Sequence, residues 1–321
     1  MTWFLWALIS MFGWGLADLF YKKGTDDSDR NSHLKIAVWV GLVMGVCALI
    51  LLPFSESGMS ISALIINAVK YSPASLCYII SMIIGYAGLR YLELSIVSPV
   101  QNASGALSAI CMILYFTIAG KSSNILNEFS PLDLAGTALI IVGVILLAVA
   151  EKKIDSETAG GETADKKYHT GAAALIFPLL YCVFDTAGTA ADGIILDEET
   201  GLGLGEIDVI ILYGLTFLLA GIVCFIILWI KDKKAYNPFA RTELLKGTAA
   251  LCEEAGQIFY IYAMASNPVL AAPMVASYCV ISVILGHVCV KEKLRRNQYI
   301  CMALVILGIV ALGVSEGLAE L

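Results

Sequence analysis

Apolar residues gather in long blocks along this chain, and short polar stretches separate the blocks. The runs at 139–150 and 210–230 contain no charged residue. A helix needs about 20 apolar residues to cross the hydrocarbon core of a bilayer, and the blocks have this length. The pattern predicts ten membrane spans, at 2–21, 35–53, 73–92, 96–119, 131–150, 170–191, 207–230, 244–265, 268–290 and 297–316.

The blocks indicate helices rather than strands. Lipid cannot satisfy backbone polar groups, so a span is either a helix or part of a closed β-barrel. Strands of such barrels are short and alternate in polarity, whereas the runs here are continuous. The third span has the least certain start, because 61–69 is also apolar and could form a short interfacial helix before it.

The composition agrees with an all-α integral membrane protein. The chain is 59% hydrophobic and 15% charged, with a mean hydropathy of +0.83. Soluble domains have about 25% charged residues, and a soluble fold could not hide this much apolar surface. The nine cysteines lie within apolar runs and form no CxxC pair. We therefore expect no disulfide, metal or cofactor site, and the absence of a basic patch argues against nucleic acid as a partner.

Two polar segments organise the chain. Residues 151–169 are rich in Gly, Thr and charge, have no apolar period, and predict a cytoplasmic linker. They separate a first five-span unit at 1–150 from a second at 170–321. The other segment, Asp192 to Asp208, carries six acids and neither Lys nor Arg, and we expect a loop there.

Basic residues are distributed unequally between the predicted loops. Of the 20 Lys and Arg residues, 18 lie on or beside the odd-numbered loops, and only Lys70 and Lys121 lie on the other side. Cytoplasmic loops of membrane proteins are enriched in Lys and Arg. The count predicts cytoplasmic odd-numbered loops, with both termini outside, in a multi-pass protein of the plasma or inner membrane.

The two halves of the sequence look like copies. Pro99 of the fourth span aligns with Pro273 of the ninth, and Gly143 of the fifth with Gly308 of the tenth. Asp18 and Asp185 align in the first span of each half. Because each half has five spans, an odd number, the copies must be inverted relative to each other in the membrane. Inverted repeats are typical of alternating-access transporters.

These features resemble the drug/metabolite transporter superfamily, in its EamA-like branch. The resemblance lies in Trp14-Gly15 followed by Lys22, and most of all between Ala265 and Gly313, which contains the motif at 290–294. It implies ten helices in two inverted repeats, a central cavity, and secondary transport without ATP. The first half departs from the family pattern, since 120–130 forms a longer polar loop after the fourth span. The family moves varied cargo, so the resemblance alone names none.

The eighth span has the clearest candidate chemistry. Glu253 and Glu254 lie about ten residues into it, and an ionised group at this depth costs roughly 2.5–3.5 kcal/mol on insertion scales. Glu253, Gln257 and Tyr260 share one helix face. Adjacent residues cannot share a face, so we expect one of the two acids to face a cavity. The alternative is a later start of the span, with both acids at the interface.

Asp185 and Asp18 are the other acidic candidates. Asp185 follows Tyr181 by one turn, and its alternative role is a structural carboxylate bonded to a hydroxyl of a neighbouring helix. Asp18 shares a face with Trp14, but it also lies four residues before Lys22, so an interfacial ion pair is the alternative.

The fourth and ninth spans supply further candidates. Gln101 and Asn102 in one span and Tyr278 in the other are polar residues that could contact cargo or join helices. Pro99 and Pro273 could act as hinges, or simply as favourable residues near helix starts.

The leading hypothesis is a secondary transporter of a small polar metabolite: an amine, an amino acid or a sugar. It would export its cargo through a central cavity by alternating access, either facilitated or coupled to protons, because a carboxylate that loses its water favours its neutral form. The alternatives are a lipid-headgroup flippase and an accessory membrane scaffold. An enzyme is disfavoured, since the three histidines lie far apart and no HExxH, Walker A or GxSxG motif is present. The partners expected are the small molecule, the bilayer and protons, in a monomer or homodimer.

Overall fold

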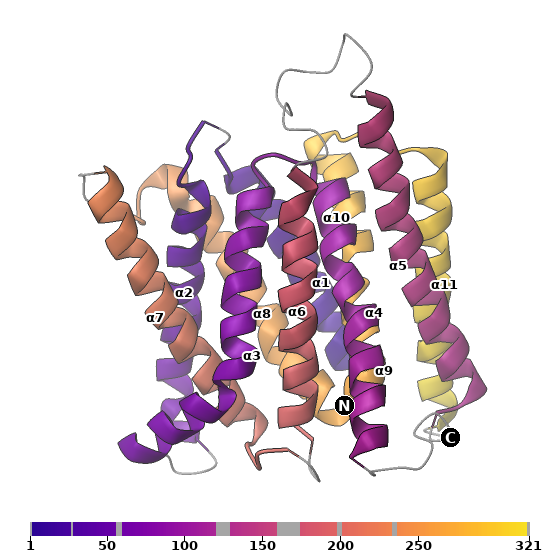
Figure 1. Cartoon of the computed structure of the whole chain (residues 1–321), viewed down its shortest axis with the longest axis horizontal. Helices are drawn as coiled ribbons and strands as arrows, with labels where there is room; N and C mark the ends of the chain where they lie inside the picture. The colour runs from indigo at the N-terminus through magenta and orange to yellow at the C-terminus, as the bar shows by residue number, and fades with distance from the viewer. Residues whose placement is uncertain are drawn as a thin grey trace.

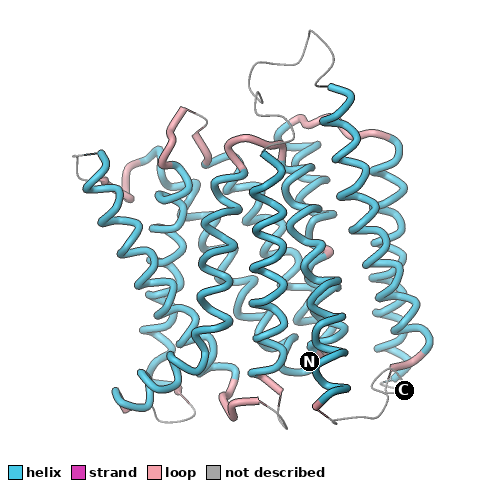
Figure 2. Tube along the Cα trace, viewed as in Figure 1, coloured by secondary structure: helices cyan, strands magenta, loops and turns pink. Residues whose placement is uncertain are grey.

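A computed structural model describes residues 2–26, 28–55, 60–119, 129–158, 174–197, 201–232 and 236–319. Every regular element in these ranges is helical, and the connections gather at the two ends of one bundle (Figure 2). The main helices are α1 (Trp3–Gly24), α2 (Ser32–Leu51), α3 (Ile61–Gly88), α4 (Leu94–Ile118), α5 (Pro131–Thr158), α6 (Ile176–Ile195), α7 (Glu206–Asp232), α8 (Leu244–Ser266), α9 (Pro268–Ala276), α10 (Tyr278–Leu285) and α11 (Arg296–Ala319). Most of the predicted linker and of the 120–130 loop lies outside the described residues.

Eight helical segments of the described chain are long and apolar enough to cross a membrane. They are α1, α2 with the following turn (Leu52–Phe54), α3, α4, α5, α7, α11, and the stretch from α9 through α10 to the π-helical turn Gly286–Val290. Helices α6 and α8 have 20 and 23 residues but are more polar, because each carries two acids in its sequence. Both lie inside the bundle among the apolar helices (Figure 1). The protein is therefore a multi-pass helical membrane protein.

The helices pack as pairs around a central group. In Figure 1, α2 and α7 flank one side of the bundle and α5 and α11 the other, while α1, α3, α4, α6, α8 and α9 lie between them. Small residues permit close helix contact in a membrane. A Cβ on Gly41 of α2 would lie 2.8 Å from the Cα of Gly221 in α7, and one on Gly308 of α11 would lie 2.6 Å from the backbone oxygen of Gly136 in α5. Both outer pairs are thus held together at facing glycines.

Three predicted boundaries differ from the structure. The start of the third span at 73 is wrong: α3 begins at Ile61 and continues through Pro73 as one helix, whose first turns bend away from the rest (Figure 1). Proline removes a backbone hydrogen bond, which permits such a bend. The predicted loop from Asp192 is also wrong at its start, because α6 continues to Ile195. Finally, α5 continues to Thr158, past the predicted end at 150.

The ninth span is interrupted. It forms α9 up to Ala276, breaks at Ser277, and resumes as α10. The hydroxyl of Ser277 donates to the backbone oxygen of Met274, a local bond that competes with regular helix geometry. Pro273, whose nitrogen cannot donate, lies one turn before the break. Its counterpart Pro99 lies inside α4, which stays continuous.

Candidate functional site

Two adjoining cavities occupy the centre of the bundle. Each has room for a few water molecules in this conformation. Five residues line both: Trp14, Met82, Tyr181, Glu253 and Tyr278. The larger cavity is lined from α1, α3, α4, α6, α7, α8, α9 and α10, so it is enclosed by both halves of the chain.

Three carboxylates face these cavities from three helices. Asp18 of α1 lines the smaller cavity, Asp185 of α6 lines the larger one, and Glu253 of α8 lines both. Glu253 interacts electrostatically with both Asp18 and Asp185. The described residues that line the two cavities include no Lys, Arg or His. The cavity therefore carries acidic groups with no basic group on its walls.

Serine hydroxyls hold the two aspartates. The Ser98 and Ser282 hydroxyls each donate to Oδ2 of Asp18, over 2.7 Å. The Ser104 hydroxyl donates to Oδ2 of Asp185, over 2.6 Å. Asp185 thus accepts the hydroxyl bond that was expected of a structural carboxylate, and it also faces the larger cavity. For Asp18, the hydroxyl bonds come from α4 and α10, while Lys22 donates to the backbone oxygens of Leu89 and Leu92.

The structure separates the two neighbouring glutamates. Glu253 is partly exposed in the cavities, and its backbone oxygen accepts the Trp14 indole N–H over 3.2 Å. Glu254 lines neither cavity. It is 7% exposed and bonds to Cys47 of α2 on another side of α8. Of the two acids, Glu253 is the one that points toward the centre.

Aromatic rings form much of the remaining wall. The Trp14 ring lies 5.0 Å from that of Tyr260 and 5.7 Å from that of Tyr278, between centroids. Tyr181 lies beside both cavities. Four further tyrosines that sequence reasoning missed also line the cavities: Tyr21, Tyr78, Tyr86 and Tyr213. Tyr71, Tyr78 and Tyr86 follow helical spacing along α3, a stripe that could have indicated this face.

Amide groups complete the polar lining. Gln257 and Asn102 line the larger cavity and Gln101 the smaller one. The Asn102 amide donates to the backbone oxygen of Ser98, over 2.8 Å. Nε2 of Gln257 is buried and has no partner among the described residues. That amide is available to a hydrogen-bond acceptor in the cavity.

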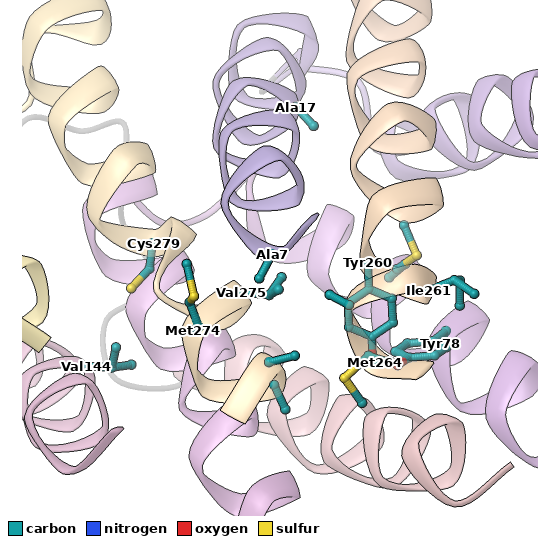
Figure 3. Close-up of a cluster of buried hydrophobic side chains, with 14 of the residues drawn as sticks. Ala7, Ala17, Tyr78, Val144, Tyr260, Ile261, Met264, Met274, Val275 and Cys279 are labelled. Atoms are coloured by element: carbon teal, nitrogen blue, oxygen red, sulfur yellow. Dashed lines mark hydrogen bonds between the residues drawn. The ribbon is translucent and has the colours of Figure 1, made fainter. Parts of the chain in front are cut away.

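A layer of hydroxyl groups lies at one end of the larger cavity. The Tyr78 and Tyr260 hydroxyls are 2.7 Å apart, and Tyr78 also donates to Thr189 over 3.2 Å. Figure 3 shows the Tyr78 and Tyr260 rings side by side, with Met264 next to them. Beyond this layer, the Tyr71 hydroxyl donates to Asp192 over 2.8 Å. Asp192 was predicted to begin a loop, so its buried position was not foreseen.

The opposite end is closed by contacts to the turn between α3 and α4. Lys22 binds two carbonyl oxygens at the end of α3, each over 2.7 Å. Glu292 accepts the backbone N–H groups of Leu94 and Ser95 at the start of α4, each over 2.9 Å. Opposite charges thus satisfy a helix C-terminus and a helix N-terminus, the ends to which they are suited. Glu292 belongs to the sequence motif at 290–294, and its distant partner could not be read from the sequence.

No group of three or more His, Cys, Asp or Glu residues in the described ranges is placed to hold a metal ion. The site consists of acids, rings and amides around a cavity. Such a set can bind an organic molecule by charge, cation–π contact and hydrogen bonding.

Comparisons with known proteins agree with this picture. Residues 200–314 match the EamA-like transporter family. Twenty-three chains of solved structures match this structure. One of them, a crystal structure, has a TM-score of 0.60 and 14% identity, over 97% of this chain and 96% of that chain. No curated protein matches the sequence. The family match lies in the second half, and the structural similarity, at this identity, shows only a shared fold over nearly the whole chain.

Proposed function

We propose that the protein is a secondary transporter of a small organic cation, on the premise that residues 200–314 match the EamA-like transporter family. The cargo would occupy the central cavity and cross by alternating access. One observation carries the proposal: three carboxylates and a set of aromatic rings face two adjoining cavities whose described walls contain no basic residue.

The proposal includes ten membrane helices in two inverted five-helix repeats, at 1–150 and 170–321. The helix packing supports it. An exchange of the two halves converts the α1–α8 pair into the α6–α3 pair, and both are extensive contacts. The same exchange maps α2–α7 and α5–α11 onto themselves, and these pairs are also extensive. A two-fold relation in the membrane plane predicts this pattern.

The charge of the site favours a cation. A cation between Glu253, Asp18 and Asp185 gains charge-assisted bonds in a site of low dielectric constant. Trp14 and Tyr260 present ring faces or edges to the same space, and cation–π contact contributes about 0.5–2 kcal/mol when the ion loses its water. The free Gln257 amide suits an acceptor on the cargo, such as a hydroxyl or carbonyl oxygen.

The orientation and direction are also proposals. The unequal distribution of Lys and Arg supports a cytoplasmic location for the end that contains Lys22 and Glu292. On the family resemblance we propose export. The enclosure of the cavity by helices of both halves supports a soluble cargo over a lipid headgroup, which would need a groove open to the bilayer.

Choline and its uncharged isostere 3,3-dimethylbutan-1-ol test the proposal. The two molecules share their shape and hydroxyl, so only the charge separates them. We expect choline to raise the melting temperature of the purified protein in a saturable way, with at least tenfold tighter apparent binding than the isostere. Equal binding of both molecules, or binding of neither, would contradict the cationic site.

Two glutamate variants locate the binding. We expect Glu253→Gln to weaken choline binding at least tenfold, which corresponds to about 1.4 kcal/mol. Glu254→Gln is the matched control, since Glu254 lies outside both cavities, and it should leave binding unchanged. If both variants bind like the wild type, the cavity is not the site. Stabilisation by phosphatidylcholine but not by choline would favour the flippase.

A further inference from the structure

Asp192 is an aspartate that the proposed cation site does not use. It lies near the end of α6, is completely inaccessible to solvent, and lines neither cavity. Its Oδ1 accepts the Tyr71 hydroxyl over 2.8 Å. Its Oδ2 is buried and has no hydrogen-bond partner among the described residues.

The surroundings of Asp192 offer no counter-ion. Four tyrosines from packed helices interact with it: Tyr71 and Tyr78 of α3, Tyr213 of α7 and Tyr260 of α8. Asp185, two turns earlier on the same face of α6, is the other titratable group. From α4, Met112 packs against the neighbouring Gly193. In this part of the structure no Lys, Arg or His faces the carboxylate. A charge buried with neither a partner nor water is costly, and the group is normally neutralised instead.

The packing also restricts what could neutralise it. A Cβ on Gly193, the next residue, would lie 2.2 Å from the sulfur of Met112 and 3.0 Å from Pro268. A metal cation needs several ligands, and the described residues place no group of three or more His, Cys, Asp or Glu side chains here. A proton is the ligand that can bind Oδ2 without any additional space.

A path of hydroxyl groups joins Asp192 to the cavity. Asp185, Thr189 and Asp192 follow one another along one face of α6, at i, i+4 and i+7. Tyr78 donates to Thr189 and also interacts with Asp192, so its hydroxyl lies between the two. Thr189 and Tyr78 line the larger cavity. Rearrangement of this one layer, shown in part in Figure 3, would expose Asp192 to the cavity.

We propose that Asp192 is a proton-binding site, sealed from the cavity by the Tyr78–Tyr260–Thr189 layer and opened when that layer separates. The cavity acids then bind the cargo, while Asp192 holds the coupling proton in the sealed state. The proton binding is independent of the proposed function. Only the coupling of that proton to cargo movement rests on it.

Infrared spectroscopy of the purified protein without cargo tests the proton site. A neutral carboxyl group has a C=O stretch that an ionised one lacks. We expect the difference spectrum between wild type and Asp192→Asn to contain this band at neutral pH. Asp208→Asn removes another buried aspartate at the same end of the bundle, one that accepts the Ser55 hydroxyl, and should leave the band in place. Only ionised-carboxylate bands in the Asp192→Asn difference would overturn the proposal.

Tyr71→Phe provides a second test if Asp192→Asn fails to fold. It removes the hydroxyl that donates to Oδ1 and keeps the ring. We expect the same C=O band to move to higher frequency, because that oxygen loses its hydrogen bond. A band that does not move belongs to another carboxyl group, and the assignment to Asp192 then fails.

Coupling is measured in vesicles that contain the protein and carry a pH gradient, with choline as the probe. We expect gradient-driven choline accumulation to fall at least tenfold in Asp192→Asn, with choline binding unchanged. Wild-type accumulation in that variant would overturn the coupling role. If the wild type moves no choline, the proposed cargo fails, and the infrared bands still decide whether Asp192 binds a proton.

Discussion

Helix α4 and the α9–α10 segment align through Pro99 and Pro273, yet they differ in polarity and continuity. Helix α4 buries six polar residues beside its apolar ones: Ser95, Ser98, Gln101, Asn102, Ser104 and Ser108. The buried residues of α9 are all apolar: Val269, Leu270, Ala271, Ala272, Pro273, Met274, Val275 and Ala276. Helix α4 is continuous, while its counterpart breaks at Ser277. Helices α4 and α9 therefore differ in the polarity of the residues that they bury.

The starts of the two segments differ as well. The first turn of α4 is capped by Glu292, almost 200 residues away in sequence. The first turn of α9 is capped locally by Asn267, whose side chain accepts the backbone N–H of Leu270 over 3.2 Å. The start of α4 therefore depends on the docking of the second half, whereas α9 can begin without the first.

The two aligned segments contribute differently to the site. Both cavity aspartates take hydroxyl bonds from α4, through Ser98 and Ser104. At the positions that match these serines, the second half has Ala272 and Tyr278, so it cannot return the same bonds. Ser282 of α10 donates the second hydroxyl bond to Asp18, so both halves supply polar contacts, whereas the buried residues of α9 are apolar.

The largest effect is expected where the two segments cross. A Cβ on Gly105 of α4 would lie 2.4 Å from the Cβ of Ala276 and 2.7 Å from the backbone oxygen of Ala272. We expect Gly105→Leu to give little folded protein, because the new side chain would overlap backbone atoms, which cannot move aside as a side chain can. Overpacking typically costs about 1–3 kcal/mol even in tolerant sites. Thermal unfolding and size-exclusion profiles of the purified variant measure this.

Gly317 of α11 provides the matched control, because nothing lies within 4 Å of a Cβ built there. Gly317→Leu should leave the melting temperature unchanged within a few degrees. A Gly105→Leu variant as stable as this control would show that α4 and α9 do not cross as described.

An intermediate effect should come from the two caps. Glu292→Ala leaves two backbone N–H groups without an acceptor at a buried helix start, and each such orphan costs about 1–3 kcal/mol. Asn267→Ala removes one ordinary N-cap, which costs about 1 kcal/mol. We expect the melting temperature to fall clearly further in Glu292→Ala. An equal fall in melting temperature in the two variants would show that the distant cap stabilises its helix no more than the local cap does.

The sequence predicted the framework of these segments better than their details. Apolar blocks, aligned prolines and the stripe of Glu253, Gln257 and Tyr260 depend on local periodicity, which a sequence displays directly. The break at Ser277 was not predictable in this way, because apolar residues continue on both sides of it. The choice between Glu253 and Glu254 needed the rotation of α8 about its axis, which its neighbours in the bundle determine.

Asp192 shows a different limit. Gly193 and the acids after it have the composition of a loop, so the sequence predicted that the helix ends before them. In the structure, α6 continues for another turn because Tyr71 of α3 supplies a partner inside the bundle. A partner 121 residues away leaves no local signal. Sealed polar groups of this kind depend on tertiary contacts that override local propensity.

The smallest effect should come from an exchange of polarity between matched positions. Ser98→Ala removes one of the two hydroxyls on Asp18, and a hydrogen bond of this kind contributes about 1 kcal/mol. Ala272→Ser adds a hydroxyl at the matching position, which lines the larger cavity, and should change the unfolding free energy by less than about 0.5 kcal/mol. Thermal unfolding and choline binding compare the two. If Ala272→Ser costs as much as Ser98→Ala, the apolar character of α9 is a packing requirement. If only Ser98→Ala has an effect, the α4 hydroxyl is needed to position Asp18 in addition to that of Ser282.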